Sequence, residues 1–271
     1  MRISSVLDYY IKNFLYIIIF VIAPAIFIGV FLKPFSMIEM LCRYPGLDIN
    51  TFGDLFGTVY SWGWLEVLAM IAGVILILIC LSLLIGKIEG HFRTGKMQLF
   101  THEWRGLNYN LAGVTKSTIL LGVVCFVLNV VALLLMYFMH FLFAINVGSI
   151  IVSSILCWII GLANLVLQAR LSTLFIMAGL DSIIMGSPYT VALSNASIAL
   201  SKDIMDTWVC TLLPYVVILI LTVIGVLLNV TILTNILSII VIMPWMVVYG
   251  MIRFFDHYSI TRYDIRKYYV R

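Results

Sequence analysis

The feature that most constrains this chain is the length of its stretches without a charged residue. Between Lys116 and Arg170 lie 53 consecutive residues without Asp, Glu, Lys or Arg, and between Asp206 and Arg253 lie 46. A charge at the centre of a bilayer costs roughly 2.5–3.5 kcal/mol, so charge-free stretches mark membrane crossings. One membrane helix needs about 20 apolar residues. Each of these two stretches is therefore long enough for a hairpin of two membrane helices.

Two shorter charge-free stretches predict one membrane helix each. Lys12 and Lys33 enclose 20 uncharged residues, and Glu66 and Lys87 enclose another 20, enough for one crossing each. Backbone polar groups in hydrocarbon must be hydrogen-bonded within their own segment, which favours helices. We therefore expect an all-α bundle of six transmembrane helices in one integral membrane domain over 1–271, with spans at about 13–32, 64–86, 117–139, 148–169, 208–228 and 233–252.

The composition excludes a soluble globular enzyme. Charged residues make up 10% of the chain and hydrophobic residues 63%, whereas a soluble domain carries about 25% charged residues. A soluble protein could not bury this much apolar surface, because much of its side-chain area must face water. We expect the lipid bilayer as the main partner. The net charge of +4 reflects the basic loops, so we expect no nucleic-acid partner.

The Lys and Arg residues predict the orientation of the chain. With a cytoplasmic N-terminus, 14 of the 16 basic residues lie inside, and only Lys33 and Arg43 lie outside. Cytoplasmic loops of membrane proteins carry such an excess of Lys and Arg. We expect both termini inside, in a multi-pass protein of a bacterial cytoplasmic membrane. The segments between the spans are then an external loop at 33–61, cytoplasmic loops at 87–116 and 170–206, and a cytoplasmic tail at 253–271.

Both cytoplasmic loops show the pattern of a short helix at the membrane surface. In the first loop, apolar residues recur on one helical face, and Trp104 and Arg105 are suited to anchor that helix at the lipid surface. The residues of this face are Phe100, Trp104, Leu107 and Leu111. In the second loop, Ser187-Pro188 is a helix start signal, and an apolar stripe follows it. The residues of this stripe are Leu193, Ala196, Leu200 and Ile204.

Two ionisable residues near the spans are candidates for function. Glu66 is the only acidic residue embedded near a membrane segment, and such groups are candidate parts of a transport pathway. Because Trp62 and Trp64 mark a membrane interface beside it, Glu66 also fits a solvated interfacial position. Arg170 lies between two apolar stretches, where it can extend to the inner surface or bind a lipid phosphate.

No arrangement of residues predicts catalysis. The four histidines never fall at a zinc-ligand spacing, and the chain has no G-x-S-x-G, Walker A or dinucleotide motif. Asp203 and Asp206 form a D-x-x-D pair that fits the start of a helix better than a metal site. We therefore expect a protein that is not an enzyme and binds neither a metal nor another cofactor.

The second cytoplasmic loop resembles one broad bacterial family. The stretch Gln168-Ala169-Arg170, an apolar segment, and then the run from Ser187-Pro188-Tyr189 to Leu200-Ser201 are similar to a family of uncharacterised six-span membrane proteins. The family includes the membrane domain fused to some glycerophosphodiester phosphodiesterases. We expect no fused phosphodiesterase, so the resemblance implies the six-span topology without that catalysis. A role in envelope homeostasis or lipid handling is the function that we expect.

The same loop also resembles the permease subunits of ABC transporters. Asn195-Ala196-Ser197, Leu200-Ser201 and Leu213-Pro214 are similar to the E-A-A…G…L-P loop that docks on an ATPase subunit, although Asn195 and Ser201 replace its Glu and Gly. The resemblance implies a transporter subunit driven by a separate cytoplasmic ATPase. Its candidate docking residues are Asn195, Ala196, Leu200 and Ser201. Self-association is the other partnership that the sequence leaves open.

Overall fold

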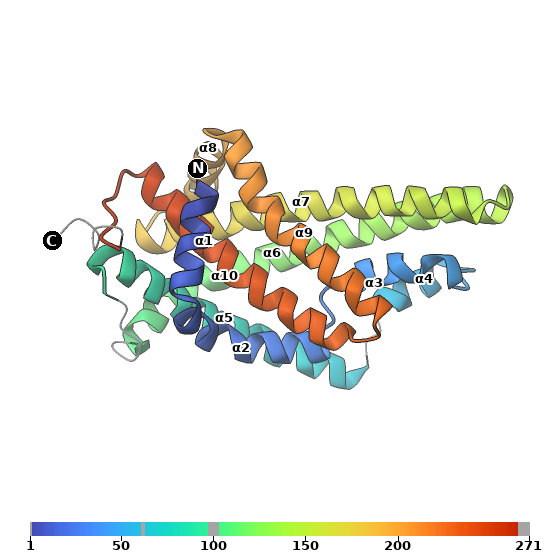
Figure 1. The fold of residues 1–271 in the computed structure, drawn as a ribbon, viewed down its shortest axis with the longest axis horizontal. Coiled ribbons are helices and arrows are strands. Elements are labelled where there is room, and N and C mark those ends of the chain that lie inside the picture. The colour runs from blue at the N-terminus through green and yellow to red at the C-terminus, as the bar shows by residue number, and fades with distance from the viewer. Residues whose placement is uncertain (1, 61–62, 97–102, 265–271) are drawn as a thin grey trace.

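The computed structural model describes residues 2–60, 63–96 and 103–264 (Figure 1). All regular structure in these ranges is helical. Six of the helices are long and apolar enough to cross a membrane, which confirms the six-span all-α fold. They are α2 (Phe14–Phe31), α5 (Trp64–Thr94), α6 (Glu103–Met139), α7 (Ile150–Ile184), α9 (Ile204–Leu227) and α10 (Thr231–His257).

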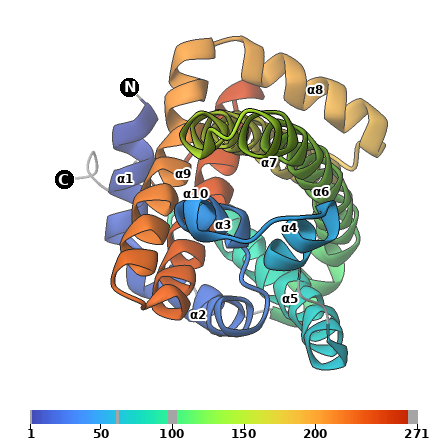
Figure 2. The same cartoon turned by 90° about the vertical axis from the view of Figure 1, so that its right-hand side faces the viewer.

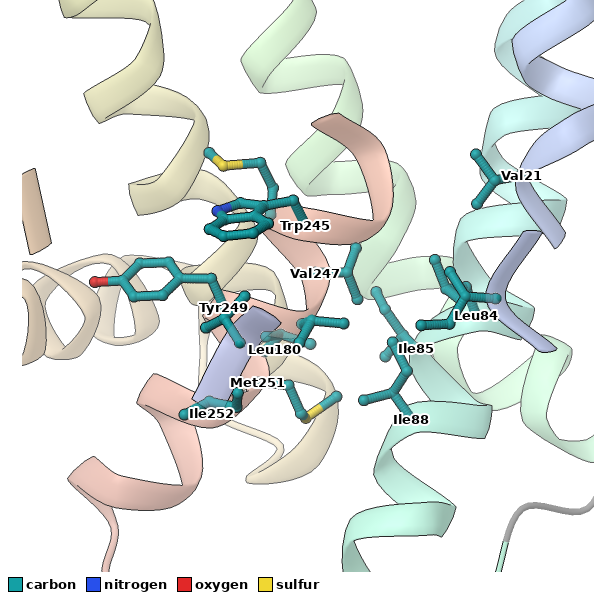
Figure 3. Close-up of a cluster of buried hydrophobic side chains, with 14 of the residues drawn as sticks. Val21, Leu84, Ile85, Ile88, Leu180, Trp245, Val247, Tyr249, Met251 and Ile252 are labelled. Carbon is teal, nitrogen blue, oxygen red and sulfur yellow. The ribbon is translucent and has the colours of Figure 1, made fainter. Parts of the chain in front are cut away.

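Helix α10 lies at the centre of the bundle. It contacts α1, α2, α5, α7, α8 and α9, and every residue from Pro244 to Phe255 is buried. Figure 3 shows Trp245, Val247 and Tyr249 of this helix beside Leu180 of α7 and Ile85 of α5. A helix that is apolar on all sides is buried on all sides. The last membrane helix therefore forms the core against which the others pack.

The N-terminal residues form a helix of their own, α1 (Arg2–Lys12), which the charge pattern did not predict. Its apolar residues Val6 and Tyr9 are buried against the bundle. The Tyr9 hydroxyl lies 2.9 Å from Nδ1 of His91 in α5, and the Tyr10 hydroxyl donates to the Ile240 carbonyl of α10 at 3.0 Å. These bonds attach α1 to one end of the core.

The loop at 33–61 is more ordered than its turn-rich sequence suggests. It contains α3 (Ser36–Arg43), a 3₁₀ turn (Tyr44–Gly46) and α4 (Phe52–Val59), and α4 begins with a capping box formed by Thr51 and Asp54. Together with α6 and α7, these segments form a second apolar core. Figures 1 and 2 show α3 and α4 beside the tip of the α6–α7 hairpin.

A buried polar chain holds this second core together. His140, in the π-helical turn His140–Asn146 that follows α6, donates from Nε2 to the Ile49 carbonyl at 2.9 Å. Its Nδ1 then accepts from the Tyr44 hydroxyl at 2.6 Å, and Tyr44 accepts from Ser153 at 2.6 Å. Every polar atom in this chain of bonds has a partner. We therefore assign these residues a structural role.

The described part of the loop at 87–116 contains no helix separate from the spans. Helix α5 continues to Thr94 and ends at Gly95, whose φ of +67° stops the helix. Helix α6 begins at Glu103, so Leu107 and Leu111 belong to the long membrane helix itself. Phe100 lies outside the described residues. No proline separates this amphipathic stretch from the span that follows, and the helix continues through both.

The loop at 170–206 does contain a separate short helix. Helix α7 extends to Ile184, and after a turn α8 (Tyr189–Ser201) begins directly behind Pro188. This agrees with the helix start predicted at Ser187-Pro188. Of the predicted stripe, Ala196 and Leu200 are buried, Leu193 is half-buried, and Ile204 belongs to α9 and is exposed. Ala192 and Ala199 complete the buried face of α8.

Candidate functional site

Helix α8 lies across one end of the bundle, on the same side as α1 and the end of α10 (Figure 1). Its small residues Ala192, Ala196 and Ala199 are buried together with Leu200 against Leu174, Met177 and Ala178 of α7. Of the four predicted docking residues, Ala196 and Leu200 are therefore in the interior. Asn195 is half-buried and Ser201 is exposed.

Asn195 takes part in a hydrogen-bond network between α7, α8 and the end of α10. Its Nδ2 donates to Oδ2 of the buried Asp181 at 2.9 Å and to the Tyr258 hydroxyl at 3.1 Å. The Tyr258 hydroxyl donates to Oδ1 of Asp181 at 2.9 Å. Burial, followed by the hydrogen bond to Asp181 and its negative charge, raises the pKa of Tyr258 to about 12. Tyr258 thus stays a neutral donor to the carboxylate.

Arg253 of α10 forms hydrogen bonds at the C-terminal end of α8. Its Nε and Nη2 donate to the Ala199 carbonyl at 3.1 and 2.6 Å, and its Nη1 pairs with Oδ2 of Asp203 at 2.8 Å. A cation beside the last carbonyls of a helix is also favoured by the helix dipole. Asn195 and Arg253 therefore hold α8 onto the bundle from its inner face.

Glu66 is an exposed residue in the first turn of α5, where a carboxylate favours the helix N-terminus. It lines a cavity of about 370 Å³ together with Lys33, Tyr60 and Asn129. This cavity lies at the end of the bundle opposite α8. The structure therefore places Glu66 at a rim rather than in the interior of the span.

Three amide side chains meet inside the α6–α7 hairpin, and the sequence analysis did not single them out. Oδ1 of Asn129 accepts from Nδ2 of Asn164 at 2.8 Å and from Nε2 of Gln168 at 2.5 Å. The signal was present in the sequence, because these are amides in a 53-residue stretch without charges. Polar side chains inside membrane bundles commonly bond across helices in this way.

An apolar cavity lies between five of the membrane helices. Its volume is about 320 Å³, and its few polar side chains include Ser172 and Tyr215, whose hydroxyls lie 2.7 Å apart. Gly122 and Gly179 contribute no side chain to its wall. Apolar residues form most of the remaining wall, among them Ile77, Leu81, Ile85, Leu121, Ile176, Ile183, Met243 and Met246.

The cavity lies where α5 and α6 separate. The two helices touch at Ser82, whose carbonyl accepts from Asn110 Nδ2 at 3.0 Å. In Figures 1 and 2 they diverge toward the tip of the α6–α7 hairpin. Gly122 on α6 is exposed although it lines the cavity, and a Cβ added there meets no atom within 4 Å. The cavity is therefore open to the surroundings of the bundle beside Gly122.

Of the three predicted membrane anchors, the structure describes the side chain of Arg170 alone. The side chains of Trp104 and Arg105 lie outside the described part. Arg170 lies within α7, and its guanidinium carbon is 5.4 Å from the centre of the Trp208 ring on α9. The charge thus lies against an aromatic ring between two membrane helices.

Comparisons with known proteins identify no relative. No protein-family model matches the chain, and neither a curated protein nor a solved structure is detectably similar to it.

Proposed function

We propose that this chain is a non-enzymatic protein of a bacterial cytoplasmic membrane that handles lipid by binding an acyl or isoprenoid chain inside the bundle. The observation that carries the proposal is the apolar cavity of about 320 Å³ between α5, α6, α7, α9 and α10. Sites for small ligands are typically apolar cavities of roughly 300–1,000 Å³ with a few polar groups. A hydrocarbon chain matches both the volume and the lining.

The position of the cavity supports a lipid rather than a water-soluble ligand. Every wall is part of a membrane-crossing helix, so a ligand entering beside Gly122 comes from the bilayer. The Ser172 and Tyr215 hydroxyls already bond to each other and offer little to a strongly polar ligand. This role is consistent with the six-span resemblance of the loop around Ser187-Pro188.

The test introduces a large side chain at one position in the cavity wall. In Gly122→Phe the new ring enters open space, whereas Val123→Phe places the same ring on a neighbouring residue that is 56% exposed and does not line the cavity. We expect the lipid retained after purification in mild detergent, measured by native mass spectrometry, to fall about tenfold in Gly122→Phe, equivalent to about 1.4 kcal/mol. Val123→Phe should retain wild-type amounts. Equal retention by both variants would contradict the proposal.

A second candidate is the permease subunit of a transporter driven by a separate ATPase. Helix α8 favours it, because Val191, Ser194 and Ile198 form an exposed face at one end of the bundle. Docking would use this outer face, since Asn195 and Ala196 face the bundle. A crosslinker at Ser194→Cys should then capture a nucleotide-binding subunit from native membranes. Recovery of the protein alone, or only as a self-oligomer, would count against a permease.

A further inference from the structure

Arg170 carries a charge that no group in the described structure balances. Its Nη1 atom is buried and has no hydrogen-bond partner, and no ion pair to a carboxylate is formed. The face of Trp208, 5.4 Å away, is its one charge-stabilising contact among the described residues. A cation–π contact contributes about 0.5–2 kcal/mol, and it leaves the buried Nη1 donor of this half-buried side chain unpaired. No described residue supplies an anionic partner to the Arg170 guanidinium.

The surroundings of Arg170 contain few other ionisable groups. On α9, Asp206 lies in the first turn, two residues before Trp208, and Asp203 pairs with Arg253 of α10. On α7, the next ionisable residue is Asp181, three turns away, which bonds to Asn195 and Tyr258. Beside Trp208, the Thr207 hydroxyl is buried and also has no hydrogen-bond partner. Thr207 is fully buried, on a different face of α9 from Trp208.

This region is separate from the apolar cavity. At 100° per residue, Arg170 shares the face of α7 that carries Leu174 and Ala178, which pack against α8. The cavity-lining residues Ser172 and Gly179 lie on the opposite face. Arg170 therefore lies about one helical turn from the α8 contact, against Trp208 of α9.

The bundle surface beside Arg170 and Trp208 is apolar. Leu167 on α7 is 45% exposed and Val209 on α9 is 48% exposed, so lipid-facing residues flank Arg170 and Trp208. Trp208 is in the second turn of α9, where tryptophan is typical of the membrane–water interface. A lipid headgroup at this level would reach the guanidinium while its chains lie along the bundle.

We propose that Arg170, with Trp208, forms a binding site for the phosphate of an anionic phospholipid. The planar guanidinium binds phosphate oxygens through two parallel N–H bonds, and Nη1 has no partner among the described residues. Basic pockets between transmembrane helices bind anionic headgroups in the same manner. This site binds a headgroup and is separate from the cavity of the proposed function, which binds a hydrocarbon chain.

The test compares a ligand that has both phosphate and chains with one that has only the chains and one that is only the phosphate. Delipidated protein in a neutral detergent is melted with phosphatidylglycerol, with diacylglycerol of the same chains, or with inorganic phosphate. We expect phosphatidylglycerol to raise the Tm of the wild type, and we expect its half-saturating concentration to increase about tenfold in Arg170→Gln. Lys116→Gln removes an equally charged but exposed side chain and should behave as the wild type.

Each outcome has a defined meaning. Stabilisation by inorganic phosphate alone, lost in Arg170→Gln, would confirm the phosphate site but make its source a free anion. Equal responses of wild type and Arg170→Gln to phosphatidylglycerol, or equal losses in Arg170→Gln and Lys116→Gln, would overturn the proposal. If Arg170→Gln does not fold, Arg170→Lys keeps the charge without the planar fork, and a weaker phosphatidylglycerol response is expected from it. An increase in Tm with diacylglycerol that is lost only in Gly122→Phe would show that the chains bind in the cavity. Phosphate binding at Arg170 would then be a separate event.

Discussion

Arg253 is a residue whose structural role differs from the one that its charge suggested. In the sequence it counts as a cytoplasmic loop charge, yet it is 2% exposed and bonds to the Ala199 carbonyl and to Asp203. We expect Arg253→Gln to lower the free energy of unfolding by about 1–3 kcal/mol, because the buried end of α8 loses its donors. A thermal melt in detergent measures the loss of stability, and limited proteolysis at the α8–α9 junction reports the loosened helix.

The control for this prediction is another arginine with an ion pair. Arg93 pairs with Glu89 one turn earlier on α5, and its side chain is 47% exposed. Exposed pairs at this spacing contribute about 0.3–0.5 kcal/mol, so Arg93→Gln should change the melting temperature little. If both variants lose equal stability, Arg253 contributes no more than a surface charge and its assigned role is wrong.

At the level of single elements, the amides of the α6–α7 hairpin form its central polar contact. Asn129 accepts from both Asn164 and Gln168, so Asn129→Leu removes two bonds and leaves two amides without their acceptor. Interhelical hydrogen bonds of this kind contribute about 0.6–1.7 kcal/mol each. We expect a loss of about 1–3 kcal/mol in the free energy of unfolding, measured by denaturation in mixed micelles. Leu134→Ala, at a residue of α6 that is 48% exposed, is the control and should lose less.

The elements that the sequence predicted well are those governed by the bilayer. All six membrane helices follow from charge-free stretches, because the cost of a buried charge depends little on neighbouring helices. The helix expected around Trp104 is not separate from the span but forms the first turns of α6. The sequence periodicity fits both arrangements equally well. The short helices α3 and α4 were not predicted because each has only 8 residues, too few for a clear period.

The candidate sites were less predictable from the sequence than the membrane helices. Glu66 and Arg170 could be singled out from the sequence because an ionisable residue near a span is conspicuous. The apolar cavity depends on where α5 and α6 separate and on residues from five helices, so no local pattern marks it. Likewise, the sequence suggests docking by Asn195, but only the packing of α8 on α7 shows that this side chain faces inward.

At the scale of the whole molecule, the basic residues predict which end of the bundle faces the cytoplasm. Helix α8 lies at one end, and α3 and α4 lie at the other (Figure 1). The excess of Lys and Arg on the α8 side predicts that this end is inside. Single cysteines at the two ends, in a variant without the five native cysteines, test this orientation directly. Asp48 precedes α4 and Ser201 ends α8, and both are exposed.

In intact cells we expect a membrane-impermeant maleimide to label Asp48→Cys and not Ser201→Cys, because the bilayer separates the reagent from the α8 end. Permeabilising the cells should make Ser201→Cys reactive as well, which controls for its intrinsic accessibility. The opposite pattern would place α8 outside and invert the topology. It would also move the Arg170 site from the cytoplasmic leaflet to the outer leaflet. The orientation thus decides which leaflet of phospholipid can reach the proposed site at Arg170.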